Sequence, residues 1–346
     1  MQNSLTNPVS TLPFLEPMKV NSTEIRVSGE TLHVPSVVIN GWTVLQMGKR
    51  VRVAVIADEQ WLEGESVEDA TAFISQLKAS GLKTDVVTFA QKLPHTERKF
   101  DLPVEWDSFA AIPISTYSHW FEKQVPKEIR QNVKKAARMG VMAKEVPFDD
   151  DLVRGVVAIY NETPIRQGKK FWHYGKGFDE IKKELSTYLE RTRFICAYCG
   201  DQMVGFIKLV RIGQVADMMH ILCRTDQAAK KPINALVAKA VEISQQMGLT
   251  HLLYGRYAYG KKRTSSLTDF KARNGFVEIL VPRYYVPLTL KGRLFLKLRL
   301  HHGVRELLPQ KLVDLLLDLR AKVYNRAGST GSSASKAEPK PAQKED

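Results

Sequence analysis

The fold is decided by residues 202–257, which read QMVGFIKLVRIGQVADMMHILCRTDQAAKKPINALVAKAVEISQQMGLTHLLYGRY. Two runs rich in apolar and β-branched residues, 202–212 and 215–225, predict two consecutive strands. The segment PINALVAKAVEISQQMG, residues 232–248, predicts a long helix, and THLLYGRY, residues 250–257, predicts another strand. The order in this stretch is therefore strand, strand, helix, strand.

The same kind of alternation extends to both sides of this stretch. Helices are predicted at 151–162 and 178–190, followed by the strand RFICAYC. After residue 257 come the predicted helix SSLTDFKARNG and the strands of FVEILVPRYYVPL. The predicted order over residues 151–290 is α-α-β-β-β-α-β-α-β, which indicates an α/β (α+β) fold.

The residues before position 151 also alternate between strands and helices. Short β-branched runs between 24 and 58 predict a meander, and 66–81 predicts a helix capped by Ser66. Residues 125–141 predict a second helix, which is opened by Pro126, stops at Gly140 and is basic on one side. The acidic run 149–151 is expected to complement the N-terminus of the next helix rather than to bind calcium.

At 346 residues the chain is long enough for two domains of ordinary size. We expect a disordered N-terminus and a disordered tail on either side of two folded domains and a basic amphipathic helical segment. In chain order these five parts are 1–22, 23–147, 148–290, 291–326 and 327–346.

Positive charge is concentrated in three segments, 123–144, 256–273 and 291–326, which together carry +17, whereas the rest of the chain carries −3. Such concentration predicts surfaces that meet phosphates, in nucleic acid, in a nucleotide-containing cofactor or in anionic lipid. The alternative is that these segments form solvated helix faces. The leucine-rich segment 291–323 either docks on the protein or lies on an anionic membrane.

The three cysteines are too few for a disulfide framework, and no apolar run reaches membrane-spanning length, so a cytoplasmic protein is expected. Cys196 and Cys199 form a CxxC motif inside a predicted strand, where residues three apart point to opposite faces. Buried thiols are expected there, and no metal site.

The element order over 151–290 resembles that of the GNAT acyltransferase superfamily. Two stretches are similar to its tandem-domain, FemABX-like branch of acetyltransferases and peptidoglycan-bridge enzymes. One is PKEIR through KA to GV within 126–141, and the other runs from Tyr254-Gly255 through Phe270-Lys271 to Asn274-Gly275-Phe276. The resemblance implies tandem GNAT-like domains, each a mixed twisted sheet flanked by helices. The first domain is degenerate, and a basic helical segment follows the second.

The resemblance also implies where an acyl donor binds. In GNAT folds the donor lies between two splayed central strands, with its pyrophosphate at the N-terminus of the next helix. The usual acetyl-CoA motif has glycines there, whereas residues 227–232 read QAAKKP. Lysines still suit phosphate, but acetyl-CoA itself is less expected. The alternative is that Lys230 and Lys231 are only exposed residues at the start of a helix. The predicted donor-binding residues are Ile221, Leu222, Cys223, Gln227, Lys230, Lys231 and Asn234.

By the same resemblance, Lys271 occupies the position at which many GNAT enzymes have a catalytic tyrosine. FemABX-like enzymes have a similar Phe-Lys, whose lysine neutralises negative charge, so Lys271 is predicted to do so here; the alternative is a solvent-facing lysine. Tyr257 and Tyr259 follow a predicted strand end and are candidates for the acid, or for aromatic packing. His220 is either a base or a hydrogen-bonded core residue.

The loop between the first two helices of the second domain commonly lines the acceptor side in this fold. Here it contains the predicted acceptor-binding residues Arg166, Gln167, His173 and Tyr174. Its cations and aromatic rings suit an acidic or ring-bearing acceptor. The alternative is a connecting loop anchored by Phe171 and Trp172.

The predicted function is an N-acyltransferase that moves an acyl or aminoacyl group to an amine. The expected cosubstrate is acyl-CoA, acyl carrier protein or aminoacyl-tRNA, with no metal. The alternative is a noncatalytic GNAT-like module that binds RNA or anionic membrane through its basic segments.

Overall fold

The computed structural model describes residues 19–27, 30–166, 168–258 and 265–302. The chain divides into two compact units, residues 1–293 and 294–346. Within the described residues, the first unit contains the sheets and the helices up to the start of α8. In the second unit, the described residues are the end of helix α8 (Leu290–Lys297) and a 3-10 turn at Leu300–His302.

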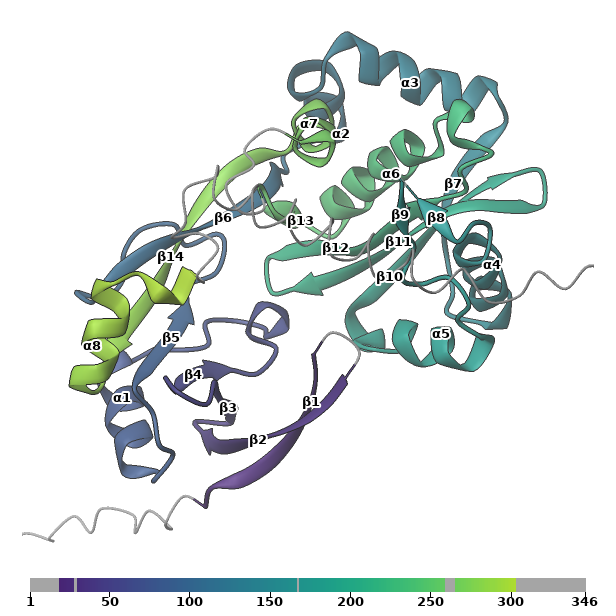
Figure 1. Cartoon of the computed structure of the whole chain (residues 1–346). Coiled ribbons are helices and arrows are strands. Elements are labelled where there is room, and N and C mark those ends of the chain that lie inside the picture. Colours follow the sequence, from purple (N-terminus) through teal and green to yellow (C-terminus); the bar gives the residue numbers. More distant parts are fainter. Residues whose placement is uncertain (1–18, 28–29, 167, 259–264, 303–346) are drawn as a thin grey trace, which may run out of the picture. The chain divides into compact units, whose positions relative to one another are not determined.

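The first unit is built on one twelve-stranded sheet, with the strand order β1-β2-β3-β4-β5-β14-β6-β13-β12-β11-β10-β7 (Figure 1). The strands of the first half are β1 (Asn21–Val27), β2 (Glu30–Ile39), β3 (Trp42–Met47), β4 (Val53–Ile56), β5 (Val86–Ala90) and β6 (Val104–Pro113). Those of the second half are β7 (Val141–Val146), β10 (Thr192–Cys199), β11 (Gln202–Ile212), β12 (Val215–Cys223), β13 (His251–Arg256) and β14 (Val277–Pro287). A small separate sheet pairs β8 (Ile165–Arg166) with β9 (Lys169–Lys170).

The helices of this unit are α1 (Ala70–Ala79), α2 (Tyr117–His119), α3 (Lys127–Arg138), α4 (Asp150–Tyr160), α5 (Phe178–Leu185), α6 (Pro232–Gln246) and α7 (Ser266–Arg273). A π-helical turn at Trp120–Gln124 follows α2, and short 3-10 turns occur at Glu59–Trp61, Leu189–Arg191 and Ala228–Lys230. From α4 to β14 the observed order contains the predicted α-α-β-β-β-α-β-α-β, with the two short strands β8 and β9 added between α4 and α5. None of the helices in the described ranges is long and apolar enough to cross a bilayer.

The two halves have matching centres. In each, two parallel strands are joined by a crossover helix: β4 and β5 by α1, and β12 and β13 by α6. Strands β14 and β6 lie between these two parallel pairs in the sheet. Each of them pairs with a strand of the other half: β6 of the first half pairs with β13, and β14 of the second half pairs with β5. The predicted domains 23–147 and 148–290 therefore share one continuous sheet.

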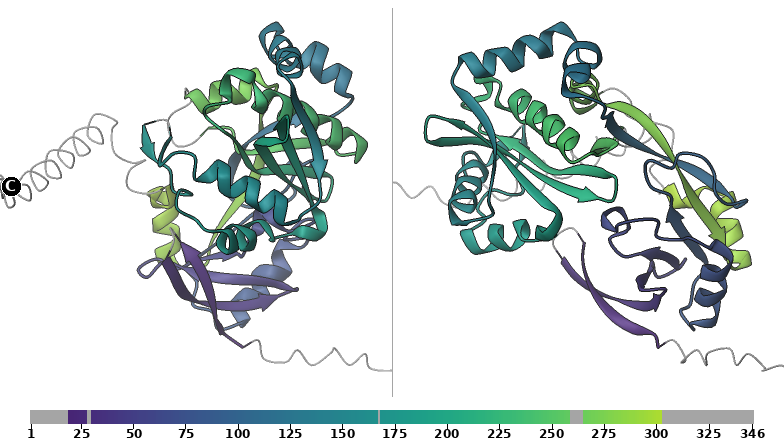
Figure 2. Two further views of the ribbon diagram at one scale, coloured as in Figure 1. Left: turned by 90° about the vertical axis from the view of Figure 1, so that its right-hand side faces the viewer. Right: turned by 180° about the vertical axis from the view of Figure 1, so that it is seen from behind.

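Side chains of β11 alternate between two apolar layers. Val204, Ile207 and Leu209 pack in the core beneath α3 and α6, whereas Phe206 packs beneath α4 and α5 on the other face (Figures 1 and 2). Further along that second face, Val210 belongs to an apolar cluster next to the first half. The second face therefore carries both the α4–α5 layer and a contact with the first half.

Local capping predictions were partly right. Asp149 Oδ1 accepts a hydrogen bond of 2.8 Å from the Leu152 N–H at the start of α4, as predicted for the acidic run. The prediction that Ser66 caps the helix of the first half was wrong. Asp69 caps α1 by accepting from two backbone N–H groups, because the helix begins at Ala70, and the Ser66 hydroxyl instead bonds Glu59.

The CxxC cysteines lie on opposite faces of β10, as predicted from strand geometry. Cys196 is fully buried in the layer beneath α4 and α5, and Cys199 packs against the layer beneath α6. Burial raises the pKa of the Cys196 thiol to about 12. The two sulfur atoms are therefore not placed to share a ligand from this strand.

Candidate functional site

The parallel ladder between β12 and β13 is short. Val215, Ala216 and Asp217 pair with residues 251–253, and the ladder then ends, although β12 continues to Cys223 and β13 to Arg256. Strands that separate in this way leave peptide groups without a ladder partner along the gap. The sheet of the second half therefore opens directly after Asp217 and Leu253.

A cavity of about 470 Å³ lies at the N-terminus of α6, and we call it the α6 cavity. Its wall comes from α3, the end of β12, the first turn of α6 and helix α7. Of the predicted donor-binding residues, Cys223, Lys231 and Asn234 line it. Ile221 and Leu222 pack instead in the two apolar layers of the sheet, and Gln227 and Lys230 lie in the preceding turn outside the wall.

Lys231 has an unusual backbone conformation at the start of α6. It is the N-cap residue with φ of 63°, in the left-handed region, and no side chain caps the helix there. Pro232 follows at the first helical position, where a missing N–H costs nothing. The α6 cavity therefore meets an uncapped helix start, which favours anions.

With Lys231 counted, the wall of the α6 cavity carries two cations and two acids. Arg273 and Glu128 face each other at 3.6 Å, and both side chains are largely exposed. Asp269 adds a second acid from α7. Asn234 is buried and donates from Nδ2 to Asn274 Oδ1 at 3.2 Å, which joins the first turn of α6 to the end of α7.

Lys271 is fully buried near the point where β12 and β13 separate. Its ammonium group donates to the carbonyl oxygen of Arg256 at the end of β13 and lies 5.0 Å from the centre of the Tyr254 ring. Burial lowers the pKa of Lys271 to about 8, and the negative charge of Asp217 acts in the opposite direction. Lys271 is thus not solvent-facing, and it remains mostly protonated at neutral pH.

Asp217 is the last residue of β12 in the parallel ladder. Its carboxylate accepts a hydrogen bond from the Gly255 N–H, which lies on β13 beyond the end of the ladder. Burial nevertheless raises the pKa of Asp217 to about 6, against the effects of this bond and of Lys271. An acid and an amine with displaced pKa values therefore meet at the opening of the sheet, a pattern common at functional sites.

His220 belongs to a different group of side chains, on the face covered by α4 and α5. Its ring centre lies 6.0 Å from that of His173, and Lys208 is its partner on β11. Burial lowers the pKa of His220 to about 4 and that of His173 to about 3, so both rings are neutral at pH 7. Lys208 is fully buried and donates to Thr187 Oγ1 at 2.6 Å.

The predicted acceptor loop is held against the end of β12. Arg166 donates to the carbonyl oxygens of Cys223 and Ile159 at 2.8 and 2.9 Å and forms an ion pair with Glu162 at 3.0 Å. His173 stacks on Tyr160, with 4.3 Å between ring centres. These contacts anchor Arg166 and His173. The alternative for this loop named Phe171 and Trp172 as its anchors; Phe171 packs against the layer beneath α4 and α5, whereas Trp172 is 70% exposed.

The other predicted residues lie in several places. Tyr174 is exposed, and Tyr257 packs at the edge of the layer beneath α6, with its N–H bonded to the Ser108 carbonyl at 3.1 Å. Gln167 and Tyr259 lie outside the described residues. The predicted catalytic residues thus separate into Lys271 at the sheet opening, His220 on the α4–α5 face and Tyr257 beside β6.

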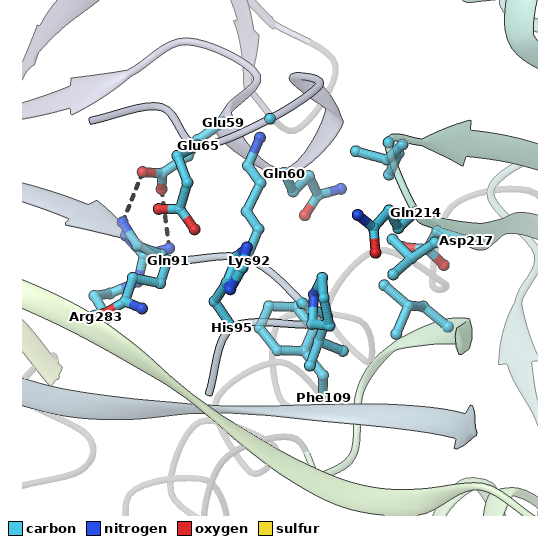
Figure 3. Close-up of a pocket in the computed structure, with 18 residues that line it drawn as sticks. Glu59, Gln60, Glu65, Gln91, Lys92, His95, Phe109, Gln214, Asp217 and Arg283 are labelled. Atoms are coloured by element: carbon cyan, nitrogen blue, oxygen red, sulfur yellow. Dashed lines mark hydrogen bonds and ion pairs between the residues drawn. The ribbon is translucent and has the colours of Figure 1, made fainter. Parts of the chain in front are cut away.

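A second cavity, of about 240 Å³, lies between the two halves of the first unit, and we call it the inter-half pocket (Figure 3). Glu59, Glu65 and Lys92 come from the first half, and Gln214 and Asp217 from the second. In Figure 3, Gln214 and Asp217 stand on one side of the pocket and Glu59, Glu65 and Arg283 on the other, with Lys92 between them. Asp217 therefore belongs both to the sheet opening and to this pocket.

Sequence reasoning missed Asp217, Lys208 and the whole inter-half pocket. A local signal existed, because Asp217 and Lys208 are single charged residues inside apolar strand sequences, VADMMHIL and VGFIKLV. A charge that is buried in this way is costly unless it has a partner or a function. The pocket itself had no such signal, because its walls come from residues 59–65, 90–95 and 212–217, which are distant in sequence.

No family model and no curated protein matches the sequence. Solved structures do match the fold. FemX superimposes with a TM-score of 0.53 at 11% identity, over 80% of this chain and 90% of that one. The C-terminal domain of a putative lysylphosphatidylglycerol synthetase from Agrobacterium fabrum matches with a TM-score of 0.49 at 13% identity, over 80% and 87% of the two chains. The structure of L-PGS from Bacillus licheniformis matches with a TM-score of 0.49 at 15% identity, over 75% of this chain and 85% of that one.

Proposed function

The chain has the GNAT-like, FemABX-type fold that its sequence predicted, and from this premise we propose that it is an N-acyltransferase. In this proposal a donor that contains phosphate binds in the α6 cavity, and its acyl or aminoacyl group enters the opening between β12 and β13. An amine then accepts the group. Fold alone does not define an activity, so the proposal depends on the geometry of the site.

The observation that carries the proposal is the position of the α6 cavity. Cys223 at the end of β12 and Lys231 at the start of α6 both line it, so it runs from the strand that opens to a helix N-terminus. Unpaired N–H groups and the positive end of the helix dipole favour anionic oxygens at such a position. The Lys231 side chain adds a positive charge at this helix start.

Lys271 is the residue proposed to assist departure of the leaving group. Its pKa of about 8 is close enough to neutral pH for the buried ammonium to give a proton to a departing oxygen or sulfur and to be protonated again. Burial also strengthens its interaction with developing negative charge. The pair Phe270-Lys271 thus keeps its predicted role in the proposal.

The surface beside the α6 cavity favours a donor with a polyanionic body. Helix α3 contributes Glu128 to the cavity wall, and its outer side carries the exposed residues Lys127, Lys134 and Arg138. A donor that leaves the cavity along α3 would meet this basic surface. Among the expected cosubstrates, this favours aminoacyl-tRNA over acyl carrier protein and free acyl-CoA.

The proposal can be tested by offering the purified chain labelled aminoacyl-tRNA, acyl carrier protein and acyl-CoA with a panel of primary amines. We expect amide product with at least one donor, and loss of product in Lys271→Met but not in Lys78→Met, an exposed lysine of α1. Failure of every donor to yield product or to bind would contradict the proposal. Donor binding should weaken with salt if the basic side of α3 takes part.

A second candidate function is an RNA-binding module without catalysis, which the exposed basic side of α3 favours. It predicts salt-sensitive binding to deacylated tRNA and to unrelated RNA alike, with no amide formation. Under this function Lys271→Met would leave binding unchanged, because Lys271 is fully buried. Lys134→Ala would weaken binding in both functions and therefore does not separate them.

A further inference from the structure

We propose that the inter-half pocket binds the acceptor, a small primary amine with an apolar body, and that Asp217 removes the proton from its ammonium group. This inference rests on the proposed function, because an acceptor presupposes transfer. It assigns the acceptor to a cavity other than the loop 166–174. It also gives a catalytic role to Asp217, a residue that the sequence did not single out.

The first support is the position of the pocket on the opposite face of the sheet from α6. Ala216 and Met218 pack in the layer beneath α6, so the alternating residues Val215 and Asp217 point to the other face, where both line the pocket. Leu253, the partner of Asp217 in the ladder, also lines it. The pocket thus ends at the two residues after which the strands separate.

The α6 cavity lies at the other end of the same opening. Cys223 lines the α6 cavity and Asp217 lines the inter-half pocket, and the two lie six residues apart on β12, about 20 Å along an extended strand. A donor bound in the α6 cavity must extend along this part of the opening to bring its acyl group beside Asp217. Two reactants that approach from opposite faces can meet without competing for space. Such an arrangement lowers the entropic cost of bringing them together.

The charges of the pocket favour a cation. Glu59 and Arg283 form an ion pair at 3.0 Å and are further engaged, Glu59 by the Ala90 N–H at 2.8 Å and Arg283 by Asp107. The ammonium of Lys92 donates to the Leu62 carbonyl, and burial lowers its pKa to about 8. Within the described residues, the Glu65 carboxylate has no hydrogen bond or ion pair.

With Glu59 and Arg283 neutralising each other, the charges that remain are those of Glu65, Asp217 and Lys92. Two acids and one amine give the pocket a net negative charge, which attracts an ammonium and disfavours a carboxylate. The rest of the wall is apolar, with Leu93, Phe109 and Val215 among its residues. At about 240 Å³ the cavity is below the usual range for large ligands, so it suits a short chain or the amine-bearing end of a longer molecule.

The chemical step balances as follows. The acceptor ammonium gives one proton to the Asp217 carboxylate, and the free lone pair forms a C–N bond with the acyl carbon. When the tetrahedral intermediate collapses, the bond from the acyl carbon to the oxygen or sulfur of the donor breaks. Lys271 gives a proton to this leaving group and then takes up the second proton of the amine nitrogen. Asp217 returns its proton to water.

Three variants of the full chain test the proposal. Asp217→Asn keeps the size and the acceptor oxygen for the Gly255 N–H but removes the base. Gln60→Trp and Gln214→Trp place a large ring at the pocket from two exposed positions, so they do not depend on repacking the core. Lys78→Trp is the matched control, because it places the same ring at an exposed position of α1 that does not line the pocket.

The measurements are amide formation with alkyl monoamines from ethylamine to hexylamine, donor binding by fluorescence anisotropy, and thermal melting. We expect Asp217→Asn to lower kcat/KM for the amine by about 100-fold or more, in the range of a lost general base. Gln60→Trp and Gln214→Trp should raise KM for the longer amines, Lys78→Trp should not, and donor binding should stay unchanged in all four. Carboxylic acids of matched length should not inhibit.

The outcomes also separate the two proposals. If the wild type forms amide and both Gln60→Trp and Gln214→Trp keep its KM, or a correctly folded Asp217→Asn keeps its kcat/KM, the pocket is not the acceptor site and the transferase function stands. If the wild type forms no amide with any donor, both proposals fall. A parallel loss of donor binding in Gln60→Trp and Gln214→Trp would also overturn the pocket assignment, since it would place the donor there.

Discussion

The ammonium group of Lys230 donates a hydrogen bond to the sulfur of Cys199 at 3.1 Å, across the space between the turn before α6 and the end of β10. The neighbouring residue, Lys231, instead lines the α6 cavity. Two adjacent lysines of one motif thus have different surroundings. Their contributions to donor binding should differ accordingly.

Lys231→Ala is expected to weaken donor binding about tenfold or more, as the loss of one charge-assisted contact would. Lys230→Ala should change it by less than about twofold, because this side chain is engaged by Cys199 outside the cavity wall. Titration of each variant with the labelled donor measures both. Equal losses in the two variants would show that Lys230 turns into the cavity when the donor binds.

Lys231→Gly should raise stability while it weakens donor binding as much as Lys231→Ala does. A left-handed backbone at a residue with a Cβ costs about 1–2 kcal/mol, and glycine escapes most of this cost. We expect Lys231→Gly to be more stable than Lys231→Ala by about 1 kcal/mol in urea unfolding. Identical unfolding of the two variants would argue against the left-handed conformation of residue 231.

Lys271→Met should stop transfer and leave the fold intact. Methionine fills nearly the same volume and removes a buried charge, which offsets the lost hydrogen bond to the Arg256 carbonyl. We expect the rate of amide formation to fall by about 100-fold or more, with unfolding free energy within about 2 kcal/mol of the wild type. If Lys271→Met stays active, Lys271 takes no part in the transfer reaction.

Asp85 makes the stability of the first half depend on pH. It is buried and accepts hydrogen bonds from the backbone N–H and the guanidinium of Arg52, at 2.9 to 3.1 Å, which lower its pKa from 3.8 to about 2. A carboxyl whose pKa is lower in the folded state stabilises above its unfolded pKa and loses this effect as the pH falls through the folded value. The contribution of Asp85 is therefore complete above about pH 5 and disappears between about pH 4 and pH 2.

Asp85→Asn should lower the unfolding free energy by about 1–3 kcal/mol at pH 7, because a buried charge-assisted hydrogen bond is lost. The difference from the wild type should shrink as the pH is lowered from 4 toward 2. Urea unfolding across this range measures it, with Asp101→Asn as a control at an exposed position. A difference that does not change with pH would mean that Asp85 keeps an ordinary pKa in the folded protein.

Much of the candidate site on the α6 side could be predicted from sequence. The start of α6 at Pro232, with Lys231 before it and Asn234 in the first turn, follows from a short local pattern and from the resemblance that located it. The different positions of the Lys230 and Lys231 side chains, one bonded to Cys199 and the other in the cavity wall, could not be predicted. They depend on the left-handed conformation of Lys231 and on Cys199, which lies on another strand.

The sequence by itself determined the order of elements from α4 to β14, the capping of α4 by Asp149 and the opposite faces of Cys196 and Cys199. These features depend on neighbours within a few residues, which periodicity and capping chemistry describe. Only the tertiary structure decided the exchange of β6 and β14 between the halves, and the pocket that brings Glu65 and Lys92 to Asp217. Those contacts join residues more than a hundred positions apart, whose pairing depends on the packing of the whole sheet rather than on any local pattern.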